Sequence, residues 1–175
     1  MTEQDRDSSR PTGDPVTGDH PPTTGGGWPV ADFDQVRRLR VIAASTPGAR
    51  IGERVLAAPF EQVWALAQDL ERTMPLWIPD VRTVRLSGRP GRGGPLTARI
   101  HGHTRLRATF TIDLEPGWCL MQSRFVLGGM AAYPESESTT RFAFLGGLRL
   151  PGVRYWGPVL RPFTGSPLDR FEALL

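Results

Sequence analysis

The sequence predicts an α+β fold in which an antiparallel sheet packs against helices. Three observations predict this fold. Residues 54–84 read as a strand, a helix, an apolar loop and the start of a second strand. Several segments between residues 81 and 145 alternate apolar and polar residues, which is the period of half-buried strands. Near the C-terminus, the pair Ser166-Pro167 is typical of a helix start and precedes the last residues, 168–175.

Composition limits the class of protein. The chain has 175 residues, 39% of them hydrophobic, enough for one domain with a real core. All 21 basic residues are arginine, which suggests a GC-rich bacterial genome. A single cysteine excludes an internal disulfide and fits a reducing compartment. Since no apolar run approaches the ~20 residues of a membrane span and no signal-peptide pattern is visible, we expect a soluble cytoplasmic protein.

The first elements follow from local patterns. Residues 1–28 are polar and rich in Gly and Pro, so they predict a disordered tail ahead of a domain at residues 29–175. Asp32 with Gln35 forms a capping-box pattern that predicts an additional helix at about Asp32–Ala44. A first strand is expected at Arg50–Ala57.

A second helix is predicted from Pro59 to a point before Pro75, because a proline is tolerated in the first turn and disfavours helix before it. Its apolar stripe comprises Phe60, Val63, Trp64 and Ala67. Residues 74–79 hold two prolines and are expected to lack regular structure. Their apolar side chains, Trp77 among them, must be buried, either in ordinary packing or at the rim of an apolar pocket.

The remaining strands are predicted from alternation and from the turns between them. They are expected at Val81–Ser87, 96–101, 105–114, 118–127, 131–134 and 139–145. Glycine pairs at 93–94, 128–129 and 146–147 indicate bends, and hence a strongly curved sheet. Pro158 and Pro162 argue against a long last helix.

Two short motifs resemble those of a known superfamily. The run VLAAPFEQVW at residues 55–64 and the run WIPDV at residues 77–81 resemble the START-like or polyketide cyclase/dehydrase (SRPBCC, Bet v 1-like) superfamily. The resemblance covers residues 50–175. It implies a helix-grip fold, in which a curved antiparallel sheet wraps a C-terminal helix around an apolar cavity. Members bind lipids, sterols, polyketides or plant hormones, and some catalyse cyclisation or dehydration.

In that family the last helix is long, whereas here prolines limit it to about nine residues, or roughly 13 Å. We therefore hypothesise that the additional helix at 32–44 helps to close the cavity. The side chains expected to line the cavity are Trp77, Ile100, Phe110, Met121, Phe125, Met130, Phe142 and Phe144. The alternative is plain core packing. Such a lining suits a flat apolar molecule, polyketide-like or lipid.

No catalytic residue is identified by the sequence, and the polar candidates are His101, Tyr133, Asp80, Arg124 and Tyr155. His101 and His103 have the spacing of a metal pair only if one strand runs through both. Gly102 favours a turn between them, and both histidines fall on the same alternating positions as the polar Arg99. We therefore predict that the histidines face solvent and that the protein binds no metal and no cofactor. Cys119 is interpreted as a small buried hydrophobe rather than a nucleophile.

A basic stretch runs from residue 81 to residue 107 and contains no Asp or Glu. Its arginines are Arg82, Arg85, Arg89, Arg92, Arg99, Arg105 and Arg107. They form either a solvated strand face or a surface for an acidic partner. A carrier protein that delivers tethered polyketides agrees with the resemblance, with contacts expected at Arg82, Arg85, Arg89 and Arg92. Nucleic acid is not favoured, since no aromatic residues are interleaved on that face.

Three functions stay open at this point. The leading interpretation is a domain of secondary metabolism that binds a hydrophobic ligand. Catalysis of the cyclisation or dehydration of that ligand is an open part of this interpretation. The second is a non-catalytic lipid or ligand carrier. The third is an interaction module that uses the arginine-rich face.

Overall fold

The computed structural model describes residues 34–88, 96–103, 107–149 and 166–175. Its strands are β1 (Ala49–Leu56), β2 (Val81–Ser87), β3 (Leu96–Gly102), β4 (Arg107–Glu115), β5 (Trp118–Gln122), β6 (Val126–Pro134) and β7 (Thr140–Leu148). Its helices are α1 (Gln35–Ser45), α2 (Phe60–Gln68), α3 (Met74–Trp77) and α4 (Ser166–Glu172). The predicted tail at 1–28 lies outside the described residues, as do Pro158, Pro162 and the Gly93–Gly94 pair.

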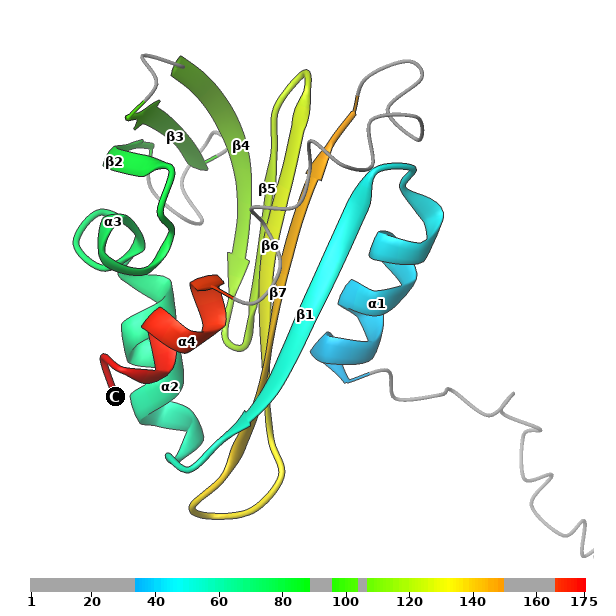
Figure 1. The fold of residues 1–175 in the computed structure, drawn as a ribbon, viewed down its shortest axis with the longest axis vertical. Helices are drawn as coiled ribbons and strands as arrows, with labels where there is room; N and C mark the ends of the chain where they lie inside the picture. Colours follow the sequence, from blue (N-terminus) through cyan, green and yellow to red (C-terminus); the bar gives the residue numbers. More distant parts are fainter. Residues whose placement is uncertain (1–33, 89–95, 104–106, 150–165) are drawn as a thin grey trace, which may run out of the picture. The chain divides into compact units, whose positions relative to one another are not determined.

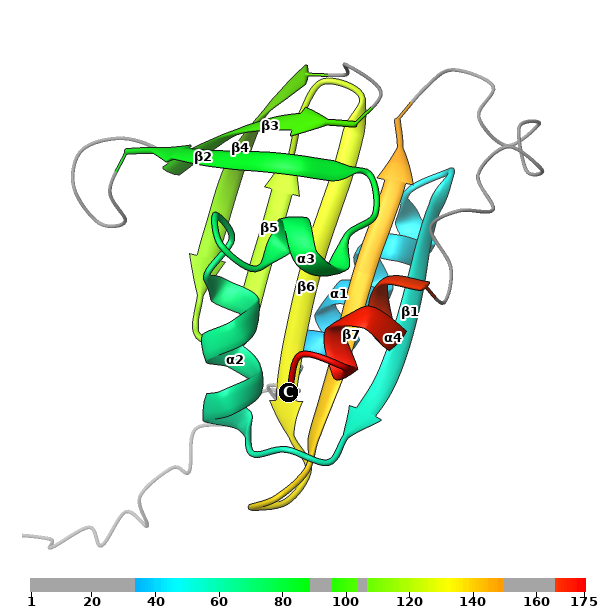
Figure 2. The same cartoon turned by 60° about the vertical axis from the view of Figure 1, so that its left-hand side comes forward.

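The strands form one antiparallel sheet in the order β1-β7-β6-β5-β4-β3-β2. The sheet is curved, with α2, α3 and α4 on its concave face and α1 on its outer face (Figure 1). Strands β1 and β2 are the two edges, and α2 and α3 carry the chain from one edge to the other across the concave face (Figure 2). The α+β class and the helix-grip arrangement predicted from the sequence are therefore confirmed.

Two apolar clusters lie on opposite sides of the sheet. The larger one fills the concave face and includes side chains from α2, α3, α4 and most strands. The smaller one lies between α1 and the outer face of β5, β6 and β7, where Leu39 and Trp118 are fully buried. Leu39 approaches the sheet closely because residue 129 is glycine: a Cβ there would lie 2.9 Å from Leu39 Cδ1.

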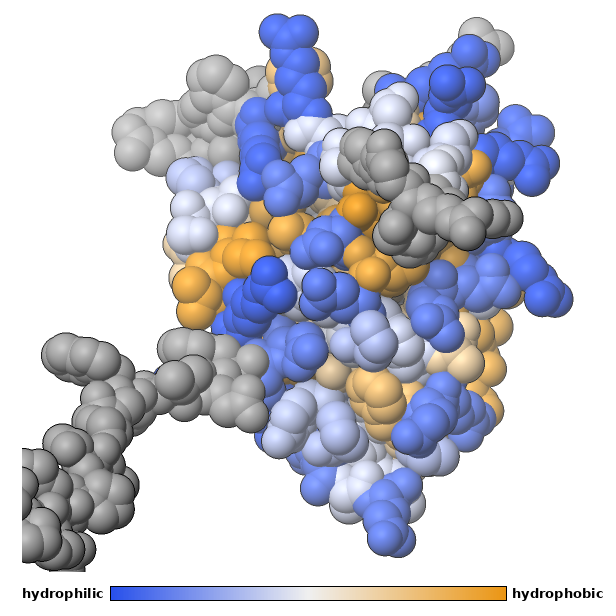
Figure 3. Space-filling model, turned by 180° about the vertical axis from the view of Figure 1, so that it is seen from behind, coloured by the Kyte–Doolittle hydropathy of each residue, from blue (hydrophilic) through white to orange (hydrophobic). Residues whose placement is uncertain are grey.

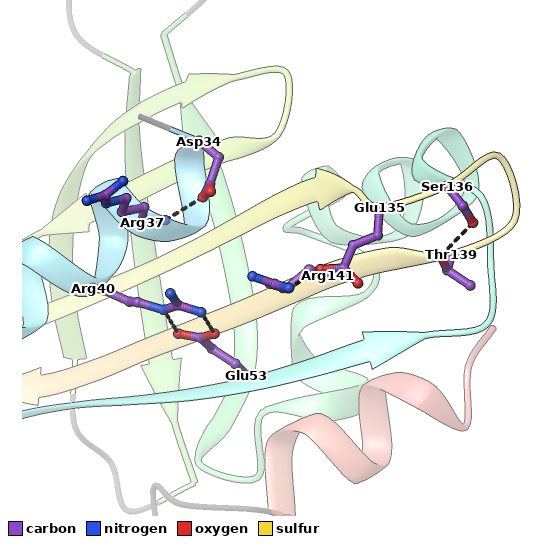
Figure 4. Close-up of polar contacts among 8 residues, drawn as sticks. All are labelled: Asp34, Arg37, Arg40, Glu53, Glu135, Ser136, Thr139 and Arg141. Carbon is purple, nitrogen blue, oxygen red and sulfur yellow. Dashed lines mark hydrogen bonds and ion pairs between the residues drawn. The ribbon is translucent and has the colours of Figure 1, made fainter. Parts of the chain in front are cut away.

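The position of α1 corrects one expectation. The hypothesis that this helix closes the cavity is wrong, because α1 packs on the face of the sheet opposite to α2, α3 and α4. Its N-cap is Asp34 rather than Asp32, and the Asp34 carboxylate accepts a hydrogen bond from Arg37 N at 2.6 Å. Arg40 holds the helix to β1 through two 2.5 Å hydrogen bonds to Glu53 (Figure 4).

Two further expectations were wrong in local detail. The segment predicted as an irregular loop contains one helical turn, α3, in which Pro75 occupies the first turn and therefore costs no hydrogen bond. The strand predicted at 118–127 is broken after Gln122 by a turn. In that turn the Ser123 hydroxyl accepts from Val126 N at 2.9 Å and thereby ends the pairing.

Cys119 lies on β5 with no exposed surface. Burial raises the pKa of its thiol to about 12, and the negative charge of Asp113 adds to the rise. The thiol is therefore protonated at neutral pH, as expected for a small buried hydrophobe.

Among the described residues, no helix is both long enough and apolar enough to cross a membrane. Seen from behind, the surface is mainly hydrophilic, with smaller apolar areas between the charged side chains (Figure 3).

Replacing Leu39 by Ala should lower the free energy of unfolding by about 2–4 kcal/mol, since a buried leucine leaves a cavity when truncated. Val41→Ala on the same helix is the matched control, because Val41 is 57% exposed and its loss should cost less than about 0.5 kcal/mol. Urea denaturation of both variants measures the difference. Equal costs would contradict the packing of α1 on the outer face.

The stability of the protein should fall as pH rises from about 9 to 12. In this range the thiol of the unfolded chain, with its ordinary pKa of 9.0, ionises while the buried thiol stays protonated. The Cys119→Ala variant has no thiol to ionise, so its free energy of unfolding should fall less steeply with pH. The slopes of the two proteins should differ by at most about 1.4 kcal/mol per pH unit. Urea denaturation between about pH 8 and 11 tests this, and parallel curves for the two proteins would refute it.

Candidate functional site

The candidate site lies on the concave face, where four aromatic rings from three distant parts of the chain meet. We call this group the aromatic cluster: Trp77 of α3, Phe142 and Phe144 of β7, and Phe171 of α4. Phe171 stacks on Phe142 with centroids 4.3 Å apart and an interplanar angle of 7°. Trp77 meets Phe171 and Phe144 edge-on, at 5.1 Å and 5.2 Å. Offset stacked and edge-on pairs are the favourable geometries for aromatic rings.

One polar atom in the cluster has no partner. The indole Nε1 of Trp77 is buried and makes no hydrogen bond within the part of the chain that the structure describes. An unpaired buried donor costs about 1–3 kcal/mol. Trp118, which is also fully buried, differs: its Nε1 donates to Asp113 Oδ2 at 3.0 Å. The site therefore presents a donor that suits an oxygen acceptor from outside the described residues.

Short polar contacts fix α3, and thereby Trp77. The Thr73 hydroxyl lies just before the helix and is within 2.7 Å of Leu66 O and 2.8 Å of Asp69 O, which holds the turn between α2 and α3. Ile78 N donates to Met74 O at 3.0 Å and closes the helical turn. On the α2 side, Glu71 accepts from Leu86 N at 2.9 Å and joins this region to the edge strand β2.

Helix α4 is held at its surface by charged groups and beneath by apolar ones. Arg54 of β1 donates to Asp169 and Glu172 at 2.6 Å each. Leu168 packs over Gly52, where a Cβ would lie 3.0 Å from Leu168 Cδ1. Phe171 is fully buried. Because the ionic contacts are exposed, the apolar side chains supply most of the docking energy.

Most of the residues expected to line a cavity share this environment. Trp77, Phe110, Met121, Met130, Phe142 and Phe144 are buried in the concave cluster, and Ile100 packs at its margin. Phe125 is placed elsewhere. It lies in the turn between β5 and β6, is 48% exposed, and has the Arg124 guanidinium 5.0 Å from its ring.

The polar candidates do not converge on the concave face. Asp80 is exposed in the turn before β2, and its backbone oxygen accepts from His103 N at 3.1 Å. Tyr133 is 43% exposed near the end of β6, and Arg124 is exposed in the β5–β6 turn. His101 lies in a hollow on the outer face of β2, β3 and β4. Tyr155 lies outside the described residues.

The described residues contain no group of three or more side chains that can hold a metal ion. His103 is exposed and His101 is half-buried on the arginine side of the sheet. Of the arginines proposed to contact an acidic carrier, Arg82 and Arg85 are exposed on β2, whereas Arg89 and Arg92 fall outside the described residues.

Sequence reasoning did not identify Phe171 or Leu168 as site residues. Their three-residue spacing on a helix was a usable signal, since positions i and i+3 share a face. Met74 and Leu70 were also missed. Both are fully buried in the same concave cluster, Leu70 between α2 and α3 and Met74 at the start of α3.

No family model and no curated protein matches the sequence. Solved structures do match the fold. The di-domain aromatase/cyclase BexL of the BE-7585A biosynthetic pathway has a TM-score of 0.56 at 17% identity, over 71% of this chain and 45% of that one. This chain thus spans about half the length of BexL.

Two other solved structures are matched over nearly their whole length. The Zhui aromatase/cyclase from Streptomyces sp. R1128 has a TM-score of 0.53 at 16% identity, over 71% of this chain and 91% of that one. A START superfamily protein from Mycobacterium smegmatis has a TM-score of 0.51 at 15% identity, over 73% and 99%. The fold of this chain is therefore the START-like helix-grip fold that these proteins share.

Proposed function

We propose that this protein binds an apolar, ring-containing small molecule, polyketide-like or lipid, between the concave face of the sheet and helices α2, α3 and α4. The observation that carries the proposal is the buried, unpartnered Nε1 of Trp77. A carbonyl or hydroxyl oxygen of the ligand accepts this hydrogen bond. The gain is large because the donor already lacks a partner in the free protein.

The side chains around Trp77 suit such a ligand. Phe142, Phe144 and Phe171 offer ring faces and edges, and Met121 and Met130 are flexible apolar side chains that adapt to the shape of a guest. Phe110 and Ile100 extend this lining toward β3 and β4. Phe125 is left out, because its ring is exposed in the β5–β6 turn.

Entry of the ligand requires a side chain to move, and we assign this movement to Phe171 with α4. The Asp169 and Glu172 side chains that bind Arg54 are 63% and 49% exposed. Exposed ion pairs of this kind contribute about 0–1 kcal/mol each. A guest ring that replaces Phe171 on Phe142 recovers the stacking that the displacement costs.

A catalytic role in cyclisation or dehydration is the second candidate, and the similarity to two aromatase/cyclase structures favours it. It requires a group that moves protons beside the ligand. Asp80, Tyr133 and Arg124 are exposed and His101 lines a hollow on the outer face, so none of them is buried with the aromatic cluster. Binding without catalysis is therefore the simpler proposal for the described residues. Turnover of a polyketide-like substrate would decide for catalysis. A cytoplasmic location stays a prediction of the sequence.

Trp77→Phe should weaken binding of a dihydroxyanthraquinone, a flat apolar probe with oxygen acceptors, by about three- to tenfold. The variant retains the aromatic ring and removes the donor, and one hydrogen bond contributes about 0.5–1.5 kcal/mol. Fluorescence titration of the purified chain measures the affinity. Native mass spectrometry of freshly purified protein tests independently for a co-purified ligand.

Trp118→Phe is the matched control. It removes a buried indole whose Nε1 already has Asp113 as partner and which lies on the outer face of the sheet. Its stability should fall while its affinity for the probe stays unchanged. The proposal fails if the unaltered protein does not bind the probe, or if both variants lose affinity equally.

A further inference from the structure

A hollow lies on the outer face of the sheet, at strands β2, β3 and β4, and is separate from the aromatic cluster. It has a volume of about 470 Å³ and is lined by Arg85, Arg99, His101, Arg107, Ala108 and Thr109. We call it the basic hollow. Its volume lies within the range of about 300–1,000 Å³ that is usual for small-ligand sites.

Strand register explains how the arginines and His101 gather there. Arg85 is the direct partner of Arg99, and His101 is the direct partner of Arg107. The two pairs stand two residues apart along β3, so they project from the same face about 7 Å apart. Val84, Ala98 and Phe110, the neighbours of opposite parity, are buried in the concave cluster.

This arrangement is unfavourable in the free protein. Like charges directly opposite each other on neighbouring strands destabilise a sheet. Within the part of the chain that the structure describes, Arg85, Arg99 and Arg107 have no carboxylate partner.

Some arginines elsewhere in the described part of the domain have carboxylate partners. Arg40 binds Glu53, and Arg141 binds Glu135 (Figure 4). Arg54 binds Asp169 and Glu172. The described lining of the basic hollow, in contrast, includes three arginines and no carboxylate.

We propose that the basic hollow binds two adjacent phosphate groups, as in a diphosphate or a bisphosphate. Guanidinium groups bind phosphate oxygens in a bidentate fashion, and each cross-strand pair can serve one phosphate. The Thr109 hydroxyl, opposite Arg99 in the register, adds a neutral donor. A nucleic acid strand is less suited, because the described lining residues include a single aromatic ring, that of His101, and base stacking needs more.

Isothermal titration of the full chain with sodium diphosphate, at constant ionic strength set with chloride, tests the proposal. The double variant Arg85→Gln, Arg99→Gln should bind diphosphate at least about tenfold more weakly, since charge-assisted hydrogen bonds are strong. Arg82→Gln is the matched control: Arg82 is exposed on the same strand and does not line the hollow. Its affinity should change less than about twofold. Thermal unfolding without ligand verifies that each variant is folded.

A second arm distinguishes the source of the phosphates. Co-sedimentation with phosphatidylcholine vesicles containing phosphatidylinositol bisphosphate tests a lipid headgroup, and diphosphate in solution tests a soluble molecule. Loss of vesicle binding in the double variant, with retention in Arg82→Gln, assigns the lipid source. Binding of diphosphate without vesicle binding assigns a soluble ligand.

Two results would overturn the proposal. One is that diphosphate binds no better than chloride at matched ionic strength and that the vesicles do not bind either. The other is an equal loss of affinity in Arg82→Gln and the double variant. Equal loss would indicate a diffuse basic surface, of the kind that an acidic carrier protein would use, instead of a built phosphate site.

Discussion

The structure depends on the packing of Phe171 between Trp77 and Phe142. These three residues come from α4, α3 and β7, and Trp77 also meets Phe144 of β7. Helix α4 has seven residues, too few to be stable without tertiary contacts. The aromatic contacts therefore decide whether the short helix remains on the sheet, and they also decide how readily it leaves.

The two faces of the sheet explain much of what the sequence could and could not predict. In β4, Phe110 and Ile112 alternate with exposed Thr111 and Asp113, because the outer face of that strand is solvated. Alternation there predicts the burial of each side chain correctly. In β5, residues Trp118–Met121 are all buried, since α1 covers the outer face. Periodicity then carries no information about where the strand ends, which is why the turn at Phe125 was predicted as strand.

The sequence predicts those features of the candidate site that depend on single residues and their immediate neighbours. Trp77 is apolar in a segment flanked by prolines, so its burial followed from composition alone. The helical turn around it was not predictable, because Pro75 is as acceptable in a first helical turn as in a loop. The position of α1 on the sheet depends on the contact between Leu39 and Gly129, which are far apart in the sequence, so no local pattern predicts it. The outward position of His101 did follow from the parity it shares with Arg99.

The hydrogen bond from Leu86 N to Glu71 has a consequence for self-association. Strand β2 is an edge of the sheet, and its free amide groups form a template on which another chain can add a strand. The Glu71 carboxylate accepts the hydrogen bond of one of these amides, Leu86 N, and the charged Arg82 and Arg85 are exposed on the same edge strand. The occupied amide and the exposed charges both oppose edge-to-edge pairing between copies of the protein. A sheet with an open edge can therefore resist aggregation.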